Sequence, residues 1–366
     1  MTDQKTDTAS IKKRASKFTF FIGIDVSRDE LDFTVLKNNQ FLSHQETRNS
    51  PEAINSFVLE LKKLLGFRMP KALFCMEDTG YYCNHLLYVL ERKKAAVCLE
   101  NALQIKKSLG ITRGKDDKID SQRIAMYAWK NRGEIRLWTP KRPAVILLGS
   151  LFRLRKRLQG VSLSLKVPLA EQGTFVNRKL QQQHVSICRR SLEATKKDIE
   201  RTDQAIDKLI SSDDNIKRLH ELITSVPCIG NITACLIIIC TNEFRDIADA
   251  RKFACYAGVA PFEKSSGKSV NKRRHVSFIA NKEMKALLHI CAMGTLRQQG
   301  EMKAYYDRKR LEGKPAMLVL NAIRNKLISR VFSCVRQGRK YTDEYKILPG
   351  SMGFQSVRAK EITVPR

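Results

Sequence analysis

Two apolar segments in the first third of the chain each contain an acidic residue. Asp25 interrupts the run from Phe20 to Val26, and Glu77 ends a second run that begins at Ala72. Short apolar runs of this length are typical of buried β-strands. An ionised carboxylate in such a strand is costly unless it is paired or binds a metal. We therefore expect the fold to bring both carboxylates to a place that a cation can reach.

Two further acids, Asp117 and Asp120, stand three residues apart at the start of a helical pattern. Residues at i and i+3 are neighbours on one face of a helix, so this pair can share a ligand. Asp116 lies about 100° round the helix from Asp117 and is left out. A solvated first turn favoured by the helix dipole is the alternative. Taken with Asp25 and Glu77, the pair predicts a divalent-metal site that acts on phosphodiesters.

The whole chain is strongly basic. Its 366 residues include 67 Lys and Arg against 37 Asp and Glu, which gives a formal net charge of +30. Apolar residues make up 43% of the chain, so it is a globular protein of two or three domains and not a disordered basic tail. Such a charge indicates a polyanionic partner, most often nucleic acid. A ribosome-associated or merely soluble basic protein is the alternative.

The 10 cysteines form no C-x-x-C pair, and most lie in apolar stretches, as Cys75 and Cys98 do. This favours buried thiols in a reducing compartment over disulfides or a zinc site. Residues 2–17 lack the apolar core of a signal peptide, and the longest apolar run, residues 232–240, is too short to span a bilayer. We expect a cytoplasmic protein of a bacterium or archaeon, without membrane contact and with direct access to DNA and RNA.

Residues 18–142 carry the pattern of an α/β domain with a mixed sheet. Three strands are expected to form a meander, followed by a helix that Ser50 caps and Pro51 opens. A strand, a helix and another strand come next. The expected strands are 18–26, 31–36, 41–47, 71–77 and 95–99, and the expected helices are 51–65 and 81–92.

Residues 143–212 change in character, because leucines, isoleucines and charged residues recur there at helical spacing. We expect two long helices that form a stalk or coiled coil, with Pro168 and Gly173 near the turn between them. A dimerisation arm and a helical subdomain without a partner fit this pattern equally well.

Residues 213–345 predict a mainly helical domain with loops at 227–230 and 261–275, and residues 346–366 predict a polar tail. The first loop, Pro227-Cys228-Ile229-Gly230, resembles a helix-hairpin-helix turn. Such turns offer backbone N–H groups to a DNA phosphate. An ordinary turn between two helices is the alternative.

The second loop contains Ser265 and Ser266 among basic residues. Gly267-Lys268-Ser269 imitates the end of a P-loop, but Phe262 stands where that motif needs glycine, which excludes an ATPase site. A serine hydroxyl can attack a phosphate when a metal or base activates it and cations hold the phosphate. From the residues alone, a plain surface loop is favoured. The basic residues expected to bind nucleic acid are Lys264, Lys268, Lys272, Arg273 and Arg274.

In combination, these motifs resemble the DEDD transposases of the insertion-sequence one-ten family and the related Piv-type DNA invertases. The resemblance covers about residues 20–335, with one departure: Cys228 stands where the family usually has glycine. The matching motifs are Gly23–Ser27, Met76–Tyr81, Gly114–Asp120, Val226–Gly230, Tyr256–Pro261 and Ser265–Lys268.

This resemblance implies a RuvC-like, RNase H-type N-terminal domain whose four catalytic acids bind Mg²⁺, or Mn²⁺ in its place. It also implies a helical transposase domain whose serine attacks DNA and forms a covalent phosphoserine link, a role that motif position gives to Ser266, with Ser265 as the fallback. It further implies a homo-oligomer, a dimer or tetramer on target and donor DNA, and for several members a structured guide RNA. By motif the acids are Asp25, Glu77, Asp117 and Asp120.

Two other functions fit the same residues. The first is a RuvC-like nuclease or resolvase that uses metal-activated water and forms no covalent intermediate. The second is a non-catalytic nucleic-acid-binding protein in which the acids serve only structure.

Overall fold

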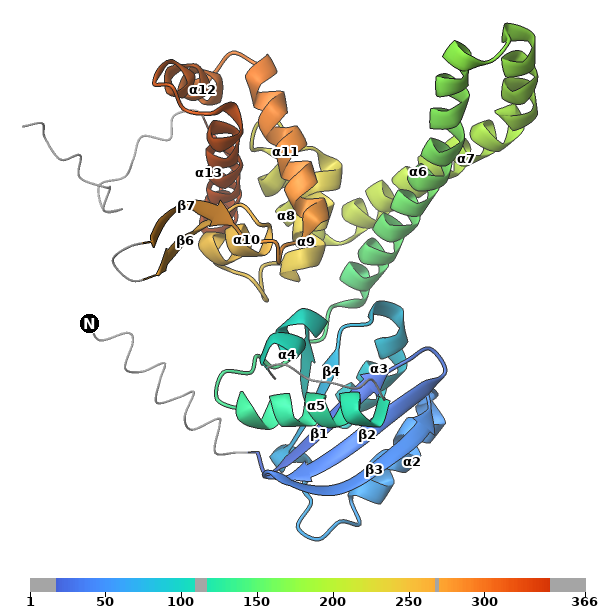
Figure 1. Cartoon of the computed structure of the whole chain (residues 1–366), viewed down its shortest axis with the longest axis vertical. Helices are drawn as coiled ribbons and strands as arrows, with labels where there is room; N and C mark the ends of the chain where they lie inside the picture. Colours follow the sequence, from blue (N-terminus) through green and yellow to red (C-terminus); the bar gives the residue numbers. More distant parts are fainter. Residues whose placement is uncertain (1–17, 109–116, 267–269, 343–366) are drawn as a thin grey trace, which may run out of the picture. The chain divides into compact units, whose positions relative to one another are not determined.

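The computed structural model describes residues 18–108, 117–266 and 270–342. The chain divides between Pro140 and Lys141 into two compact units, each with its own core. Figure 1 shows the elements of each unit.

The first unit is built on a five-stranded mixed sheet of order β3-β2-β1-β4-β5. The first three strands form the predicted antiparallel meander, and β1, β4 and β5 are parallel neighbours. This confirms the α/β class expected from the sequence. The strands are β1 (Phe20–Val26), β2 (Glu30–Lys37), β3 (Gln40–Arg48), β4 (Ala72–Glu77) and β5 (Ala96–Glu100).

Helices cover both faces of this sheet, because alternate residues of each buried strand point to opposite sides. One face packs against α2 (Pro51–Leu61) and α3 (Asn84–Arg92), with side chains such as Ile22 and Ile24 in its core. The other face packs against α5 (Asp117–Lys130), with side chains such as Phe21. The short helices are η1 (Met69–Lys71), η2 (Gly80–Cys83) and α4 (Ala102–Ser108).

The predicted start of α2 is confirmed, and its predicted end is four residues too long. The Ser50 side chain accepts a hydrogen bond from the Ala53 N–H at 3.3 Å, and Pro51 is the first helical residue. The helix ends at Leu61, its last buried residue, and Leu65 is almost fully exposed. Continuing the helix to Leu65 would gain no burial there.

The second unit begins with two long helices, α6 (Pro143–Phe175) and α7 (Arg178–Ser212), which pack side by side as predicted (Figure 1). The turn was predicted too early, because Pro168 and Gly173 both lie inside α6. Gly173 instead makes room for Gln181, whose amide nitrogen lies 2.7 Å from where a Cβ on Gly173 would stand. The Asn177 side chain caps α7 by accepting from the Lys179 N–H at 2.9 Å.

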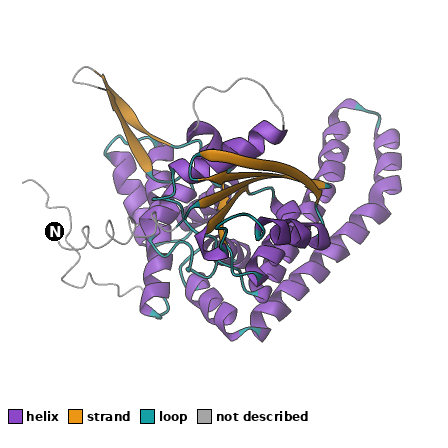
Figure 2. Ribbon diagram, turned by 90° about the horizontal axis from the view of Figure 1, so that it is seen from below, coloured by secondary structure: helices purple, strands orange, loops and turns teal. Residues whose placement is uncertain are grey.

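The rest of this unit is a helical bundle with a two-stranded hairpin, β6 (Pro261–Ser266) and β7 (Val270–Val276), which extends from the helices (Figure 2). The prediction of a loop over 261–275 is therefore wrong. These strands are mostly polar and charged, so they lack the alternating apolar residues by which strands are usually found. The helices are α8 (Asp214–Thr224), α9 (Asn231–Thr241), α10 (Ala250–Tyr256), α11 (Lys282–Arg297), α12 (Glu301–Leu311) and α13 (Ala316–Gln337). Across the described ranges, no helix is long and apolar enough to cross a bilayer.

Arg142 ties the start of α6 to the bundle. Its guanidinium donates two hydrogen bonds of 2.8 Å to Asp213, and donates to Glu243 at 2.8 and 2.5 Å. Asn215 donates to Glu243 at 2.6 Å. Glu243 is the middle one of three residues with positive φ, between Asn242 and Phe244, a backbone that persists only when its surroundings fix it. Arg142 therefore holds together three segments that are distant in sequence.

We expect Arg142→Met to destabilise the second unit by about 3–5 kcal/mol at pH 7, because the buried Glu243 carboxylate loses its close ion pair and keeps only the Asn215 hydrogen bond and an ion pair of 3.8 Å with Arg245. Burial raises the pKa of Glu243, but hydrogen bonds from Arg142 and Asn215 outweigh it and lower that pKa below its ordinary value. The Arg142 hydrogen bond likewise lowers the pKa of Asp213. A carboxyl with a lowered pKa stabilises the fold above its unfolded pKa and loses this effect as pH falls through the folded one.

The difference between wild type and Arg142→Met should therefore shrink below about pH 4. Urea unfolding followed by circular dichroism at pH 7 and at pH 3.5 measures it. Arg201→Met is the control, because Arg201 forms an exposed pair with Asp198 whose loss should cost less than about 1 kcal/mol. Equal losses at both pH values would contradict the role given to the carboxylates.

Candidate active site on the α5 face of the sheet

The acids at the ends of β1 and β4 lie on the face of the sheet that α5 covers. Phe21 of β1 and Cys75 of β4 belong to the core under α5. Asp25 lies four residues after Phe21, and Glu77 lies two residues after Cys75, so strand alternation places both carboxylates on that same face. Both residues are half-buried. The alternation of side chains along β1 and β4 is therefore enough to put the two strand acids on one face of the sheet.

Gly23 allows α5 to lie directly on β1. A Cβ on Gly23 would stand 2.2 Å from both the Ala125 nitrogen and the Ser121 carbonyl oxygen, so the helix backbone occupies the space of a side chain. The Ser121 and Thr34 hydroxyls share a buried hydrogen bond of 2.8 Å beside this contact. Asp120 precedes Ser121, and the close packing therefore fixes its distance from the strand acids.

Electrostatics show that three of the four predicted acids lie near one another. Burial raises the pKa of Glu77, and the charges of Asp25 and then of Asp120 raise it further. The ammonium of Lys106 on α4 acts in the opposite direction. Glu77 therefore experiences the like charges of a strand acid and of a helix acid together.

The N-terminal turn of α5 supplies the predicted helix pair. Asp120 is half-buried, and it accepts a hydrogen bond of 2.7 Å from Arg123, one turn later. Asp117 is the first residue of α5, and the structure describes its backbone only. Asp116 lies outside the described residues. The choice of Asp117 over Asp116 stays a prediction.

Glu100 is an acid at this edge that the sequence analysis missed. It is the register partner of Glu77 on the neighbouring parallel strand. Its carboxylate accepts hydrogen bonds from the Tyr127 hydroxyl at 3.1 Å and from the Asn101 N–H at 3.0 Å. Burial raises the pKa of Tyr127, and the charge of Glu100 raises it further, so the phenol remains a donor. Glu100 ends an apolar run just as Glu77 does, and that signal could have found it.

The donor set fits a hard divalent cation, because carboxylate oxygens are the ligands that Mg²⁺ and Mn²⁺ prefer. Within the described part of the chain, no three acidic, histidine or cysteine side chains are already close enough to form a metal site. The Asp117 side chain is not among those described. The described carboxylates therefore lie on the same face of the sheet, but they are not yet close enough together to coordinate one metal ion.

The predicted nucleophile and basic residues belong to the second unit. Ser265 and Ser266 end β6, opposite Asn271 and Val270 in register. The backbone places Lys264 opposite Lys272, and both Arg273 and Arg274 lie in β7. Lys268 lies outside the described residues, and the side chains of the others are not described. Their roles stay predictions.

The turn predicted to contact DNA lies between α8 and α9, as expected, and Gly230 is the residue before α9. Cys228 has φ of 64°, in the left-handed region that favours glycine. Its thiol donates to the Gln298 side chain at 3.3 Å, and Gly294 leaves room for it. The turn therefore forms despite the cysteine. Its contact with a DNA phosphate stays a prediction.

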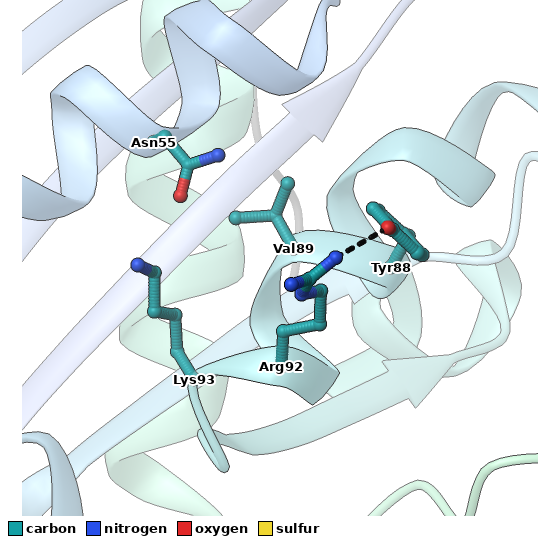
Figure 3. Close-up of a pocket in the computed structure, with 5 residues that line it drawn as sticks. All are labelled: Asn55, Tyr88, Val89, Arg92 and Lys93. Atoms are coloured by element: carbon teal, nitrogen blue, oxygen red, sulfur yellow. Dashed lines mark hydrogen bonds between the residues drawn. The ribbon is translucent and has the colours of Figure 1, made fainter.

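A separate hollow of about 470 Å³ lies on the opposite face of the first unit, between α2 and α3 (Figure 3). Arg92 lies over the Tyr88 ring and donates to its hydroxyl at 2.7 Å. Lys93, Asn55 and Val89 complete the wall. None of these five lining residues is a carboxylate, so the hollow lacks the ligands that a site for a hard divalent cation needs.

Two sequence models of protein families match the chain. The one described as "Transposase IS116/IS110/IS902 family" matches residues 220–307, and the one described as "Transposase", for DEDD proteins of IS110 elements, matches residues 22–170. The first match contains β6 and β7, and the second contains the whole acidic face. Both regions singled out above therefore lie inside transposase matches.

Similar proteins include the pilin gene-inverting proteins of Moraxella bovis and Moraxella lacunata. Each is 24% identical, over 330 and 333 residues respectively, which is 88% of this chain and 97% of the relative. A 43.6 kDa protein of insertion element IS110 from Streptomyces coelicolor is 30% identical over 123 residues, 34% of this chain and 30% of that protein. A solved structure, T. thermophilus RuvC in complex with Holliday junction substrate, aligns at 15% identity over 33% of this chain and 99% of the RuvC chain, with a TM-score of 0.26.

We expect Gly23→Ala to lower the stability of the first unit by about 1–3 kcal/mol, because the new methyl group would meet the α5 backbone. Displacement of α5 should also weaken the response of the melting temperature to Mg²⁺. Gly160→Ala is the control: a Cβ there meets nothing within 4 Å, and alanine favours helix α6 by up to about 1 kcal/mol. If both variants melt like wild type, the close approach at Gly23 is not a constraint.

We expect Glu77→Gln to raise the melting temperature in a chelating buffer at pH 7. A carboxyl whose pKa is raised by folding binds its proton more tightly in the folded state, so stability falls as pH rises through the folded pKa. At neutral pH the ionised Glu77 carboxylate therefore destabilises the fold, and glutamine, which carries no charge, removes this destabilisation. The same variant should lose most of the stabilisation that Mg²⁺ gives to wild type.

The measurement is thermal unfolding with and without Mg²⁺. Glu91→Gln, an exposed residue of α3, is the control and should change neither value. A lower melting temperature for Glu77→Gln in chelator, or an unchanged Mg²⁺ response, would contradict this prediction.

Proposed function

The chain belongs to the IS116/IS110/IS902 family of transposases, and on that premise we propose that it breaks and rejoins DNA through a serine nucleophile assisted by metal-binding acids. It is a DNA recombinase of the transposase class. The proposed ligands of the metal are Asp25, Glu77, Asp117 and Asp120, and the proposed nucleophile is Ser266.

The observation that carries this proposal is the repulsion at Glu77. Asp25 and Asp120 come from β1 and α5, and both charges raise the pKa of Glu77 on β4. A fold brings like charges together at a cost, so a cation that binds all of them is the simplest reason for the arrangement. When bound, Mg²⁺ would neutralise charge on the reacting phosphate and lower the pKa of the attacking hydroxyl.

The proposed reaction is a transfer of a phosphoryl group to the serine. The Ser266 oxygen forms a bond to phosphorus and loses its proton, and the bond from phosphorus to the 3′ oxygen breaks. The 3′ oxygen leaves with a proton as a hydroxyl, so the strand remains attached to the protein through its 5′ phosphate. The reverse transfer, from serine to a new 3′ hydroxyl, would rejoin the strand without an external energy source.

The partners proposed are DNA, a second copy of the chain and a structured guide RNA. The net charge of +30 supports nucleic-acid binding, and the basic residues of β6 and β7 lie beside the proposed serine. Large apolar side chains are exposed along α6 and α7, including Phe175 and Ile187, and they support the use of these helices as a dimerisation arm. The Mg²⁺ preference and the oligomeric state belong to this proposal.

We expect wild-type protein to form a covalent adduct with the 5′ phosphate of a nicked or suicide DNA substrate, and Ser266→Ala to form none. Loss of the hydroxyl removes the nucleophile, whereas Ser265→Ala, its neighbour in β6, should retain adducts. Denaturing gels followed by peptide mass spectrometry locate the link. Asp25→Ala is the control for the metal, because it should abolish adducts while Ser266 is still present.

Adducts lost only in Ser265→Ala would move the role by one residue. If wild type exchanges strands and yet forms no adduct, the serine mechanism is wrong. A metal-dependent nuclease with a water nucleophile would then explain the acids.

A further inference from the structure

Arg324, on α13, is a buried cation without an acidic partner. Its side chain and backbone together are 4% exposed, deep in the core of the second unit. Across the residues that the structure describes, no carboxylate lies within ion-pair distance of its guanidinium, and its Nε has no hydrogen-bond partner. Arginine is almost never fully buried unless it is paired. Packing alone therefore does not explain why an arginine occupies this position.

Two neutral side chains contact the guanidinium. One terminal nitrogen donates to Nδ1 of His289 at 2.7 Å, and the other donates to the Asn321 side chain at 3.4 Å. Because arginine has no acceptor, Nδ1 of His289 must be the unprotonated nitrogen, and the ring proton is on Nε2. Burial and the charge of Arg324 both lower the pKa of His289, in agreement with a neutral ring. His289 is thus fixed as a donor through Nε2.

The acids in the first turns of two neighbouring helices, α11 and α12, have other partners. Glu283 of α11 pairs with Lys156 at 2.9 Å, and Glu301 of α12 pairs with Arg330 and Lys326. None of these pairs involves Arg324. Among the side chains that the structure describes, the guanidinium therefore has no counter-ion, which makes it a candidate for binding an anionic ligand.

The same cluster reaches the segment that leads into β6. Asn321 donates to the Val259 carbonyl at 2.8 Å, two residues before β6 begins. Lys285 precedes His289 by one helical turn, and its ammonium lies 3.8 Å from where a Cβ on Gly258 would stand. Both Lys285 and His289 are half-buried, so part of each side chain reaches solvent, whereas Arg324 is almost entirely closed off from it.

We propose that Lys285 and His289 bind a backbone phosphate of DNA at the base of the β6–β7 hairpin, with Arg324 as the positioning residue behind them. Arg324 holds the imidazole with its Nε2–H outward and adds a positive field that water does not screen. The anion in turn supplies the counter-charge that the guanidinium lacks. The choice of DNA rests on the proposed recombinase function, since this segment leads directly to the strand that carries Ser266.

The test compares Arg324→Met with wild type, both as full-length protein, by titrating fluorescent duplex DNA in EDTA over a range of salt concentrations. We expect a loss of affinity of about tenfold and a log–log salt slope smaller by about one, because the buried positive charge that helps to neutralise this phosphate is removed. The melting temperature without DNA should stay equal or rise, since an apolar side chain of similar length replaces an unpaired buried charge. Arg324→Lys should recover part of the affinity.

Two controls separate binding from folding and from total charge. Leu327→Ala, a fully buried neighbour on α13, should lower the melting temperature and leave the salt slope unchanged. Arg336→Met removes one exposed charge from the last turn of the same helix and should weaken binding less than Arg324→Met. His289→Phe should reproduce the loss caused by Arg324→Met, because phenylalanine has no N–H group to donate to the phosphate.

Unchanged DNA affinity in Arg324→Met would overturn this assignment, as would a loss of affinity that appears equally in Leu327→Ala. A loss confined to a structured RNA in a parallel titration would overturn the choice of DNA. These outcomes do not depend on catalysis, because EDTA prevents metal binding. A wild-type protein that binds no DNA would instead count against the proposed function.

Discussion

The acidic face depends on how closely one helix can approach one strand. At Gly23 the backbone of α5 occupies the volume that any other side chain would need, with its Ser121 oxygen and Ala125 nitrogen only 2.2 Å from the missing Cβ position. A helix held so near to β1 can carry Asp120 to within the electrostatic reach of Glu77. With a larger residue, α5 would have to move outward and the helix acids would move with it. The glycine therefore sets the geometry on which the charges depend.

Charges of one sign gathered by a fold are a cost that the rest of the unit must offset. The pKa of Glu77 is raised by burial and by two neighbouring carboxylates, with only Lys106 acting against them. Glu100 adds a further negative charge at the same edge, held by Tyr127 and the Asn101 N–H. The two apolar cores on either side of the sheet stabilise the unit against this repulsion. Such conflicts between local cost and overall stability are expected where a site has a function.

The sequence was sufficient where a pattern repeats and insufficient where the structure depends on one contact. Continuous apolar runs predicted both β1 and β4, which are buried along almost their whole length, whereas the side on which Asp25 and Glu77 lie followed only from the packing of α5. Pro168 misled the prediction of the turn, because α6 continues through it as Gly173 admits Gln181 from α7. The β6–β7 hairpin has no apolar alternation and was predicted as a loop. Glu100 was visible at the end of its strand, but its hydrogen bond from Tyr127 joins residues 27 apart and could not be read from spacing.

Two arginines of the second unit differ in whether their hydrogen-bond partners are charged, and this difference indicates different roles. Arg142 donates to Asp213 and Glu243 with the fork geometry that suits carboxylates. These carboxylates offset the desolvation of its guanidinium, and the hydrogen bonds hold the start of α6 against the helical bundle. Arg324 is much more deeply buried than Arg142, which is only half-buried, and it contacts only an imidazole and an amide, which carry no charge to offset its own. Hydrophobic side chains of similar volume would pack that position at lower cost. A cation kept there is better explained by an anion that arrives from outside, and for a chain of net charge +30 that acts on DNA the abundant anion is phosphate.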